Sequence, residues 1–358
     1  MTTPEILTIA SLDCGYPSLS VLEHVGFSVH EGEMVCLLGA SGDGKTTLLK
    51  SIAGLLSPEK GRIVIAGQNV TPLQTQCGEP SPGVVRMAFQ DDVLFPHLTV
   101  MENITFGLRG KSSEDVSTLA MDVVGVMRLE TFTRCYPHEL SREQYQRAAI
   151  ARALACQPKL LLLDEPFSSI DSQLRYPLIS ELRQILRQRQ IATLFATSDR
   201  EEAFAFADHL ILIHDGGIVQ QGFSADLYYR PVNRYVASFM GNTNYLPVKI
   251  SGDRQWQSFL GEHQATRALK LPHGAQYDWL VRPQEIALAL DEDGPGVIED
   301  RLFMGNSNFY RIRVNELALQ VQSGNWFEPG QPVRLSIRID QPVLFPPQSA
   351  ISTQELRA

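Results

Sequence analysis

The segment Gly39–Thr46, with the sequence GASGDGKT, constrains the fold of this chain more than any other. It matches the pattern G-x-x-x-x-G-K-[ST], whose glycine-rich backbone surrounds phosphate groups. A short apolar run over residues 33–38 precedes it, and helical spacing follows over 47–55. Because strand, loop and helix arrive in the order that such a loop requires, the segment predicts an α/β fold with a nucleotide site at the loop.

The loop supplies most of the predicted nucleotide ligands. Glycine lets backbone N–H groups turn inward around a polyphosphate, and the following helix points its positive end at the same anion. Lys45 adds a positive charge toward the β and γ phosphates, and the Thr46 hydroxyl is a candidate ligand of Mg2+. The predicted contacts in this region are Gly39, Ser41, Gly42, Gly44, Lys45, Thr46 and Thr47.

Tyr16 is a separate candidate for contact with the base. It lies in a Gly15-Tyr16-Pro17 turn that we predict between strands over residues 6–12 and 21–30. An exposed aromatic ring at this place can stack on adenine, and it can equally cover an edge of the core. The residue type alone leaves both interpretations open.

Two further apolar runs end in polar residues suited to a bound triphosphate. The run over 84–89 ends at Gln90, and the four leucines at 160–163 end at Asp164 and Glu165. In α/β sheets, ligand chemistry lies at the carboxyl ends of the strands. We predict that Asp164 holds Mg2+ through water, that Glu165 polarises the attacking water, and that Gln90 binds Mg2+ or orients water.

Composition limits the class of protein and its partners. At 358 residues the chain is longer than one core usually organises, so two domains are expected. A net charge of −9 without a long basic run argues against nucleic acid as the main partner. The chain shows neither a long apolar span nor the features of a signal peptide, and its 5 cysteines are scattered. These features favour free thiols in the cytosol.

Taken together, the motifs resemble the ATP-binding subunit of an ABC transporter, specifically an importer with a carboxyl-terminal regulatory domain. The resemblance rests on the loop, Gln90, Leu140–Ser141 with Arg147–Leu154, Leu160–Glu165 and Ser168–Asp171. It implies a homodimer around two Mg-ATP, partnered by membrane permease subunits and, indirectly, by a periplasmic substrate-binding protein. It places the chain as a peripheral subunit on the cytoplasmic face of the inner membrane, with no nucleic-acid partner.

The resemblance also favours a cargo and a permease contact. Residues 93–100 and 136–141 look most like ferric-iron importers, although sulfate, polyamine and sugar importers share the layout. Leu94–Leu98, beside Gln90, is the candidate surface for the permease. The cargo does not touch such a subunit, so its identity is not encoded in a pocket of this chain.

The predicted architecture has two domains. Residues 1–240 form an α/β P-loop NTPase domain of the ABC ATPase type, with an inserted helical subdomain at about 91–156. Residues 241–358 form a small all-β, OB-like barrel, because apolar residues alternate there, as in Tyr310, Ile312 and Val314. This part, including Val281–Gln284, resembles the family's regulatory (TOBE) domain and is expected to make dimer contacts.

Two positions depart from the family pattern. The usual signature Leu-Ser-Gly-Gly-Gln is replaced by Leu140–Gln144, LSREQ, and Ser198 stands where the family has histidine. In the family the signature, here through Ser141, caps the γ phosphate bound to the opposite subunit, and the histidine holds the hydrolytic geometry. LSREQ also fits a capping box with Glu143 in the first helical turn, as in an ordinary capped helix. Alternatively, Arg142 supplies a cation to the γ phosphate.

These departures leave two hypotheses open. The first is an ATPase that powers an importer, with Ser198 and Glu165 in the catalytic centre. The second is an ATP-binding regulator or heterodimer partner that hydrolyses ATP weakly or not at all. Serine is too short to replace the histidine contact, which favours the second hypothesis, whereas the retained Glu165 favours the first.

Overall fold

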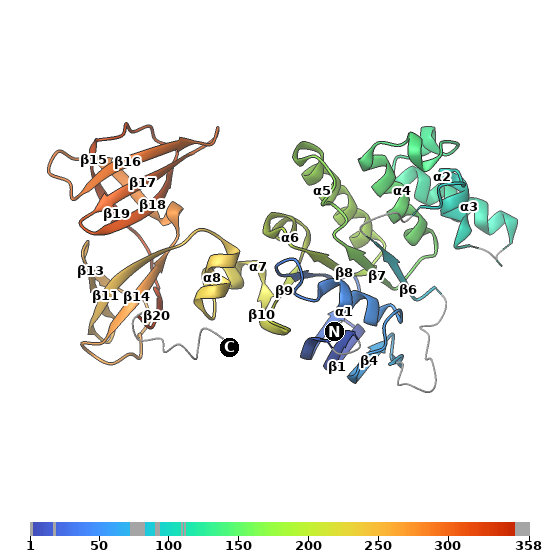
Figure 1. The fold of residues 1–358 in the computed structure, drawn as a ribbon, viewed down its shortest axis with the longest axis horizontal. Coiled ribbons are helices and arrows are strands. Elements are labelled where there is room, and N and C mark those ends of the chain that lie inside the picture. The colour runs from blue at the N-terminus through green and yellow to red at the C-terminus, as the bar shows by residue number, and fades with distance from the viewer. Residues whose placement is uncertain are drawn as a thin grey trace. The chain divides into compact units, whose positions relative to one another are not determined.

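The computed structural model describes residues 3–16, 19–71, 83–89, 94–108, 110 and 112–347. By its contacts the chain forms two compact units, residues 1–224 and 225–358 (Figure 1). Residues 225–240, which the sequence places at the end of the first domain, are thereby part of the second unit. Within the described ranges, no helix is both long and apolar enough to span a membrane.

A largely parallel sheet forms the centre of the first unit. Its strand order is β10-β9-β3-β8-β7-β6, and all neighbours are parallel except the β9–β10 hairpin. Its buried central strands are the continuous apolar runs expected of strands covered on both faces. The strands are β3 (Met34–Leu38), β6 (Val85–Ala88), β7 (Leu160–Asp164), β8 (Ala192–Thr197), β9 (His209–His214) and β10 (Gly217–Phe223).

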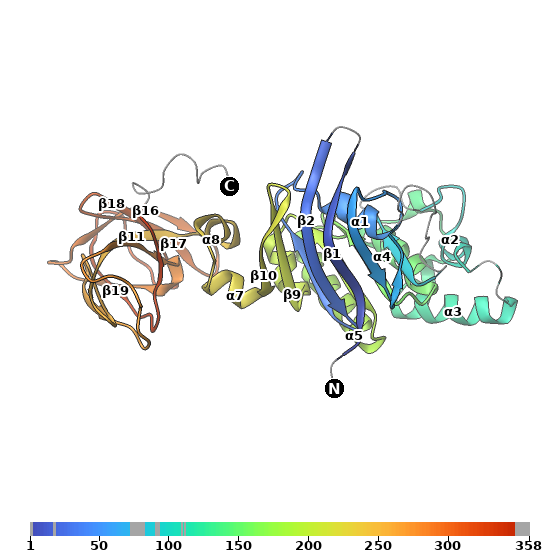
Figure 2. The ribbon, with the colours of Figure 1, turned by 90° about the horizontal axis from the view of Figure 1, so that it is seen from below.

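A second, antiparallel sheet packs against the first (Figure 2). It consists of β1 (Glu5–Tyr16), β2 (Leu19–His30), β4 (Lys60–Ile65) and β5 (Gln68–Asn69). The predicted Gly15-Tyr16-Pro17 turn is wrong for Gly15 and Tyr16, which continue β1 and pair with Ser20 and Leu19, while Pro17 lies outside the described residues. A Cβ at Gly15 would lie 2.2 Å from the Leu19 carbonyl oxygen, so the glycine permits this close strand pairing rather than a turn.

The helices of the first unit fall into two groups. Those of the central fold are α1 (Lys45–Ile52), α5 (Ser172–Gln188) and α6 (Arg200–Phe206), and Pro177 lies inside α5. Beyond the β6 edge lie α2 (Val100–Phe106), α3 (Ser113–Val126) and α4 (Arg142–Ala155), with short 3-10 turns at Glu130–Phe132 and Pro137–Glu139 (Figure 1). Capping hydroxyls of Thr99, Ser112 and Ser141 begin these three helices.

The described part of the second unit contains two α-helices, a short 3-10 turn at Pro283–Glu285 and two five-stranded antiparallel sheets. The helices are α7 (Ser224–Tyr229) and α8 (Arg234–Met240). The first sheet, in the order β13-β12-β11-β14-β20, contains β11 (Asn244–Gly252), β12 (Gln255–Ser258), β13 (Gly261–Gln264), β14 (Gln276–Val281) and β20 (Val343–Phe345). The other, in the order β15-β19-β16-β17-β18, contains β15 (Ile286–Leu290), β16 (Gly296–Phe303), β17 (Asn308–Val314), β18 (Leu317–Ser323) and β19 (Pro332–Ile337).

The alternation that predicted this all-β part is confirmed by burial. Tyr310, Ile312 and Val314 are buried in one core, while Arg311 and Arg313 between them are exposed. The period of two therefore separates core from solvent along β17, as expected for strands with one covered face.

Arg282 explains why α7 and α8 group with the second unit. Its guanidinium donates to the carbonyl oxygens of Ala237, Gly241 and Asn242 at 2.8, 3.0 and 3.2 Å, and to that of Tyr228 at 2.8 Å. The group is buried and lies over the Tyr228 ring. One side chain of the all-β part thus satisfies the carbonyl ends of both helices.

Candidate nucleotide site

The phosphate loop joins β3 to α1, and its backbone is shaped by glycine. Gly42 and Gly44 have φ values of +96° and +91°, a region that favours glycine. A Cβ at Gly44 would lie 2.8 Å from Val21 Cγ1, so this position also lacks room for a side chain. Helix α1 has Gly44 as its N-cap residue, with neither a side-chain cap nor an acidic residue in its first turn, which leaves its positive end to an anion.

Lys45 is held across the loop. Its Nζ donates to the carbonyl oxygens of Gly39 and Ala40 at 2.9 and 2.8 Å. Burial lowers the pKa of Lys45, while the nearby carboxylates of Glu165, Asp43 and Asp164 act in the opposite direction. The ammonium is therefore poorly hydrated and available to an anionic partner at the loop.

Two of the predicted Mg2+ ligands lie together at the carboxyl end of β7. The Thr46 hydroxyl donates to Asp164 Oδ1 at 3.0 Å, and Asp164 is 4% exposed. Burial raises the pKa of Asp164, and the bond from Thr46 lowers it. A hydroxyl and a carboxylate at this distance are the hard oxygen donors that suit Mg2+, which takes its remaining ligands from phosphate and water. The residues present therefore fit a magnesium ion.

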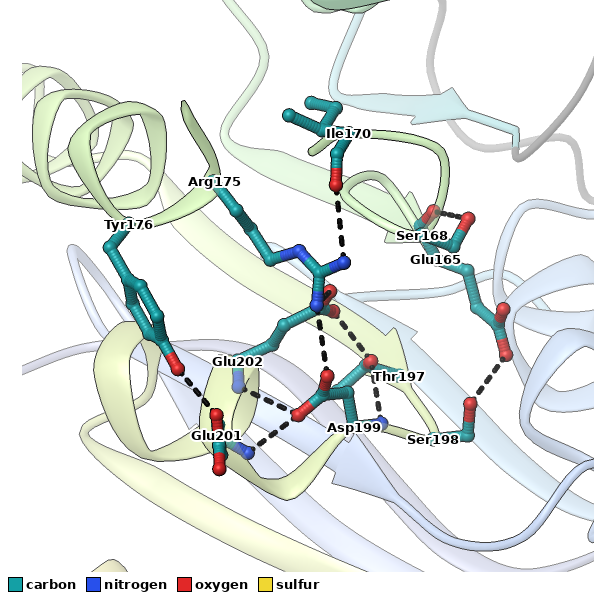
Figure 3. Close-up of polar contacts among 10 residues, drawn as sticks. All are labelled: Glu165, Ser168, Ile170, Arg175, Tyr176, Thr197, Ser198, Asp199, Glu201 and Glu202. Carbon is teal, nitrogen blue, oxygen red and sulfur yellow. Dashed lines mark hydrogen bonds and ion pairs between the residues drawn. The ribbon is translucent and has the colours of Figure 1, made fainter. Parts of the chain in front are cut away.

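Glu165 and Ser198 face one another at the next position along the sheet edge. Ser198 Oγ donates to Glu165 Oε1 at 3.4 Å (Figure 3). Glu165 has a φ of +44°, and its backbone N–H donates to the Ala196 carbonyl oxygen at 2.8 Å. A non-glycine residue in this region is uncommon and marks a position held by its surroundings. The sheet thus brings two of the predicted catalytic side chains, those of Glu165 and Ser198, to one place.

A polar network that the sequence did not predict lies beside Ser198 (Figure 3). The Thr197 hydroxyl donates to Glu202 Oε2 at 2.7 Å, and Asp199 caps α6 by accepting from the N–H groups of Glu201 and Glu202. Arg175, on α5, pairs with Asp199 and Glu202. Asp199 with glutamates two and three positions later indicates a helix start, but no sequence signal identifies Arg175 as its partner.

The altered signature forms the capped start of α4. Ser141 Oγ accepts from the Gln144 N–H at 3.3 Å, and Gln144 Oε1 accepts from the Ser141 N–H at 2.8 Å, which confirms the predicted capping box. Glu143 pairs with Arg147 at 2.9 Å, and Arg147 pairs with Glu181 on α5 at 2.7 Å. The Glu143 carboxylate therefore belongs to an ion network with Arg147 and Glu181, while Arg142 is exposed.

The remaining predicted residues take different positions. Gln90, the third predicted Mg2+ ligand, lies outside the described residues. Tyr16 ends β1 and is 42% exposed, which leaves its ring accessible for stacking. Ser41 is exposed in the loop, whereas Thr47 is buried in α1. Asp43, which the sequence did not single out, accepts from the Ala40 N–H at 2.7 Å and braces the loop.

The loop, the parallel strand order and the Thr46–Asp164 pair define a P-loop nucleotide-binding protein. The family model described as ABC transporter matches residues 22–168, and that of the TOBE domain matches residues 279–345. The chain belongs to the family of ATP-binding subunits of ABC importers with a TOBE domain, which are ATPases coupled to transport.

Relatives that match most of the chain are named for different cargoes. The Fe(3+) ions import ATP-binding protein FbpC of Escherichia coli O157:H7 is 34% identical over 90% of this chain and 92% of its own. The spermidine/putrescine import ATP-binding protein PotA of Marinobacter nauticus is 33% identical over 94% and 92%. The sulfate/thiosulfate import ATP-binding protein CysA 2 of Chromobacterium violaceum is 39% identical over 79% and 75%.

Solved structures agree with the fold of the first unit. A dimeric ATP-binding cassette in a post-hydrolysis state, bound to ADP and Pi, matches with a TM-score of 0.54 and 27% identity over 61% of this chain and 98% of that one. A cassette in its ADP conformation matches with a TM-score of 0.58 and 22% identity over 66% and 98%. The second likeness concerns the fold alone.

Proposed function

We propose that this chain binds Mg-ATP at Gly39–Thr46, hydrolyses it, and so powers import through a membrane permease. The observation that carries the proposal is the convergence of Lys45, the Thr46–Asp164 pair and Glu165 at the carboxyl edge of the central sheet. A cation, an oxygen pair for a metal and a carboxylate for water are the parts that phosphoryl transfer to water requires.

Each of these residues has a distinct proposed role. Lys45 leaves its two carbonyl partners for the β and γ phosphates, which satisfy the same donors with a full negative charge. Thr46, Gln90 and, through water, Asp164 would hold Mg2+, which would neutralise the charge that develops on the phosphate oxygens. Glu165 accepts a hydrogen bond from the attacking water, and its left-handed backbone fixes the direction of that carboxylate.

The proposal extends to partners. The chain acts as a homodimer in which Ser141 of one subunit reaches the γ phosphate held by the other, at the cytoplasmic face of the inner membrane. Leu94–Leu98 contacts the permease, and a periplasmic substrate-binding protein delivers the cargo. Ferric iron is the proposed cargo because of residues 93–100 and 136–141, and the iron, polyamine and sulfate names of the relatives mark the alternatives.

The test is Mg-ATP turnover by the purified chain, alone and with its permease in detergent. The variant Glu165→Gln serves as the blank, because it keeps the shape of the side chain and removes the charge that orients water. Turnover well above this blank is the expected result. Equal turnover in the two proteins, with ATP bound by both, would contradict the proposed catalytic function.

A second candidate function is an ATP-binding partner subunit that hydrolyses ATP weakly. It is favoured by Ser198, whose 3.4 Å contact is with Glu165 and whose side chain is shorter than the family histidine. ATP binding without turnover, combined with rescue by Ser198→His and a restored glycine signature, is the result that would favour this candidate.

A further inference from the structure

Arg175 lies at the centre of the network around Ser198, and the roles proposed above do not use it (Figure 3). Its Nη2 donates to the Ile170 carbonyl oxygen at 3.1 Å. Its Nη1 lies 3.0 Å from Asp199 Oδ2 and 3.3 Å from Glu202 Oε1. The guanidinium therefore joins two segments that are distant in the sequence.

Each of the two segments is adjacent in the chain to a predicted catalytic residue, one to Glu165 and the other to Ser198. Ile170 belongs to the loop that starts at Glu165, where the Ser168 hydroxyl also donates to the Glu165 carbonyl oxygen at 3.0 Å. Asp199 follows Ser198 and begins α6. A displacement of the guanidinium would thus change the position of Glu165 on one side and of Ser198 on the other.

The charges at this place need a cation. Glu202 is 2% exposed, and burial raises its pKa, while the Thr197 bond and Arg175 lower it. Asp199 and Glu165 act on the same carboxyl as like charges, and the Cys36 thiol lies near it. Arg175 pairs with both Glu202 and Asp199, so its removal takes a cation from two neighbouring carboxylates.

We propose that Arg175 is a positioning residue for hydrolysis, which ties the loop after Glu165 to the start of α6 and so keeps the Ser198 hydroxyl beside the Glu165 carboxylate. The inference rests on the ATP hydrolysis proposed above. It assigns to Arg175 no contact with ATP, so it predicts an effect on the chemical step with little effect on nucleotide binding.

The test compares Arg175→Gln with Arg183→Gln, a matched change on the same helix. Arg183 also joins a carbonyl oxygen and a carboxylate, those of Ala205 at 3.4 Å and Asp208 at 2.7 Å, and its side chain is 30% exposed against 22% for Arg175. Arg175→Gln should lower kcat about tenfold and change KM for ATP less than about twofold. Arg183→Gln should change both by less than about twofold.

A double-mutant cycle tests whether Arg175 acts through Ser198. In the Ser198→Ala background, Arg175→Gln should lower kcat by a clearly smaller factor than in the parent chain, because the hydroxyl that it positions is already gone. Arg175→Lys keeps the charge but cannot make the forked contact, so it should recover only part of the rate. Equal factors in both backgrounds would overturn the inference.

The outcomes separate this inference from the proposed function. Parent turnover above the Glu165→Gln blank, together with an unchanged kcat in Arg175→Gln, overturns the positioning role alone. Parent turnover equal to the blank overturns both. If Arg175→Gln does not fold, Arg175→Lys takes its place, and a loss equal to that in Arg183→Lys overturns the role.

Discussion

The phosphate loop and the start of α4 are both helix N-termini, yet their polar groups are arranged in opposite ways. Helix α1 begins with Gly44, without a side-chain cap, and its N–H groups are left for a ligand. Helix α4 begins with Ser141 and Gln144 in a complete capping box, with Glu143 in the first turn. An anion site thus depends on which N–H groups a helix start leaves unsatisfied, because both helices begin with the same backbone donors.

The difference between the two helix starts follows from the residues that each contains. Glycine removes the Cβ and lets the loop backbone turn inward, whereas Ser141 and Gln144 place side-chain oxygens on the same kind of donor. The carboxylate of Glu143 adds the charge that the helix dipole favours. We therefore expect nucleotide binding to depend on the first helix start, and the rate of hydrolysis to be limited at the second.

The largest expected effect is at the uncapped loop. Lys45→Ala should weaken Mg-ATP binding about tenfold to a hundredfold, because a charge-assisted hydrogen bond contributes about 1.5–3 kcal/mol. Isothermal titration with a slowly hydrolysed ATP analogue measures the change. Lys60→Ala, on an exposed lysine that pairs with Asp13, is the control and should bind as the parent does. If Lys45→Ala bound Mg-ATP as tightly as the parent chain, the expectation that nucleotide binding depends on the loop at the start of α1 would be wrong.

The next effect is at the capped start and at Ser198. Replacing Arg142 and Glu143 with glycine and Ser198 with histidine should raise turnover about tenfold or more, because the restored contacts act on the transition state. Steady-state phosphate release measures it, with Glu165→Gln added to the same background as the blank. An unchanged rate would mean that Ser198 and the altered signature are already compensated.

A smaller effect concerns the ion network that Glu143 joins. Glu181→Gln removes one charged partner of Arg147, whose side chain is 10% exposed, and of Arg128. We expect the free energy of unfolding to fall by about 1–3 kcal/mol, since a buried charge loses a charged partner. Urea denaturation of the full chain, followed through the transition of the first unit, measures the change. Asp122→Asn, which breaks the more exposed pair with Arg189, should cost less than about 1 kcal/mol.

The smallest expected effect is a change in the pKa of Tyr176, which contacts Glu201 in α6. The bond to Glu201, at 2.6 Å, raises the pKa of Tyr176 to about 12 from 10.0. Because the pKa is raised in the folded state, this contribution to stability is complete below pH 10.0 and is lost as the pH rises toward about 12.

Glu201→Gln should therefore bring the ionisation of Tyr176 back toward its ordinary pH. The tyrosinate absorbance at a pH of about 11 should rise relative to the parent chain. The same substitution in a Tyr176→Phe background should leave the absorbance unchanged, and a rise there would assign the signal to another tyrosine.

Local motifs could be predicted from the sequence because their partners are close along the chain or share an edge of the sheet. The loop around Lys45 and the strand that ends at Asp164 follow from short patterns, and the strand order brings them together. The prediction of a turn at Gly15 and Tyr16 was wrong, because Gly15 allows β1 to approach and pair with β2. Composition does not distinguish these two uses of glycine.

The long-range ion pairs could not be predicted in the same way. Arg147 lies 34 residues from Glu181, and Arg175 lies 24 residues from Asp199. An arginine on a helix surface has several possible partners, and only the packing of α5 against its neighbours selects one. Arg147 and Arg175 were therefore not singled out as members of ion networks, whereas Lys45, Asp164 and Glu165 were singled out as site candidates.

The four carbonyl contacts of Arg282 bear on how this chain can be divided or recombined. Helix α8 buries Val236, Ala237 and Met240, and Ala237 packs with Leu280 and Phe345 of the all-β part. A graft that exchanges the TOBE-containing module between relatives should therefore join ahead of Ser224. A junction after Met240 would separate Arg282 from the carbonyl oxygens of Tyr228 and Ala237, and would leave α8 with its apolar face in water.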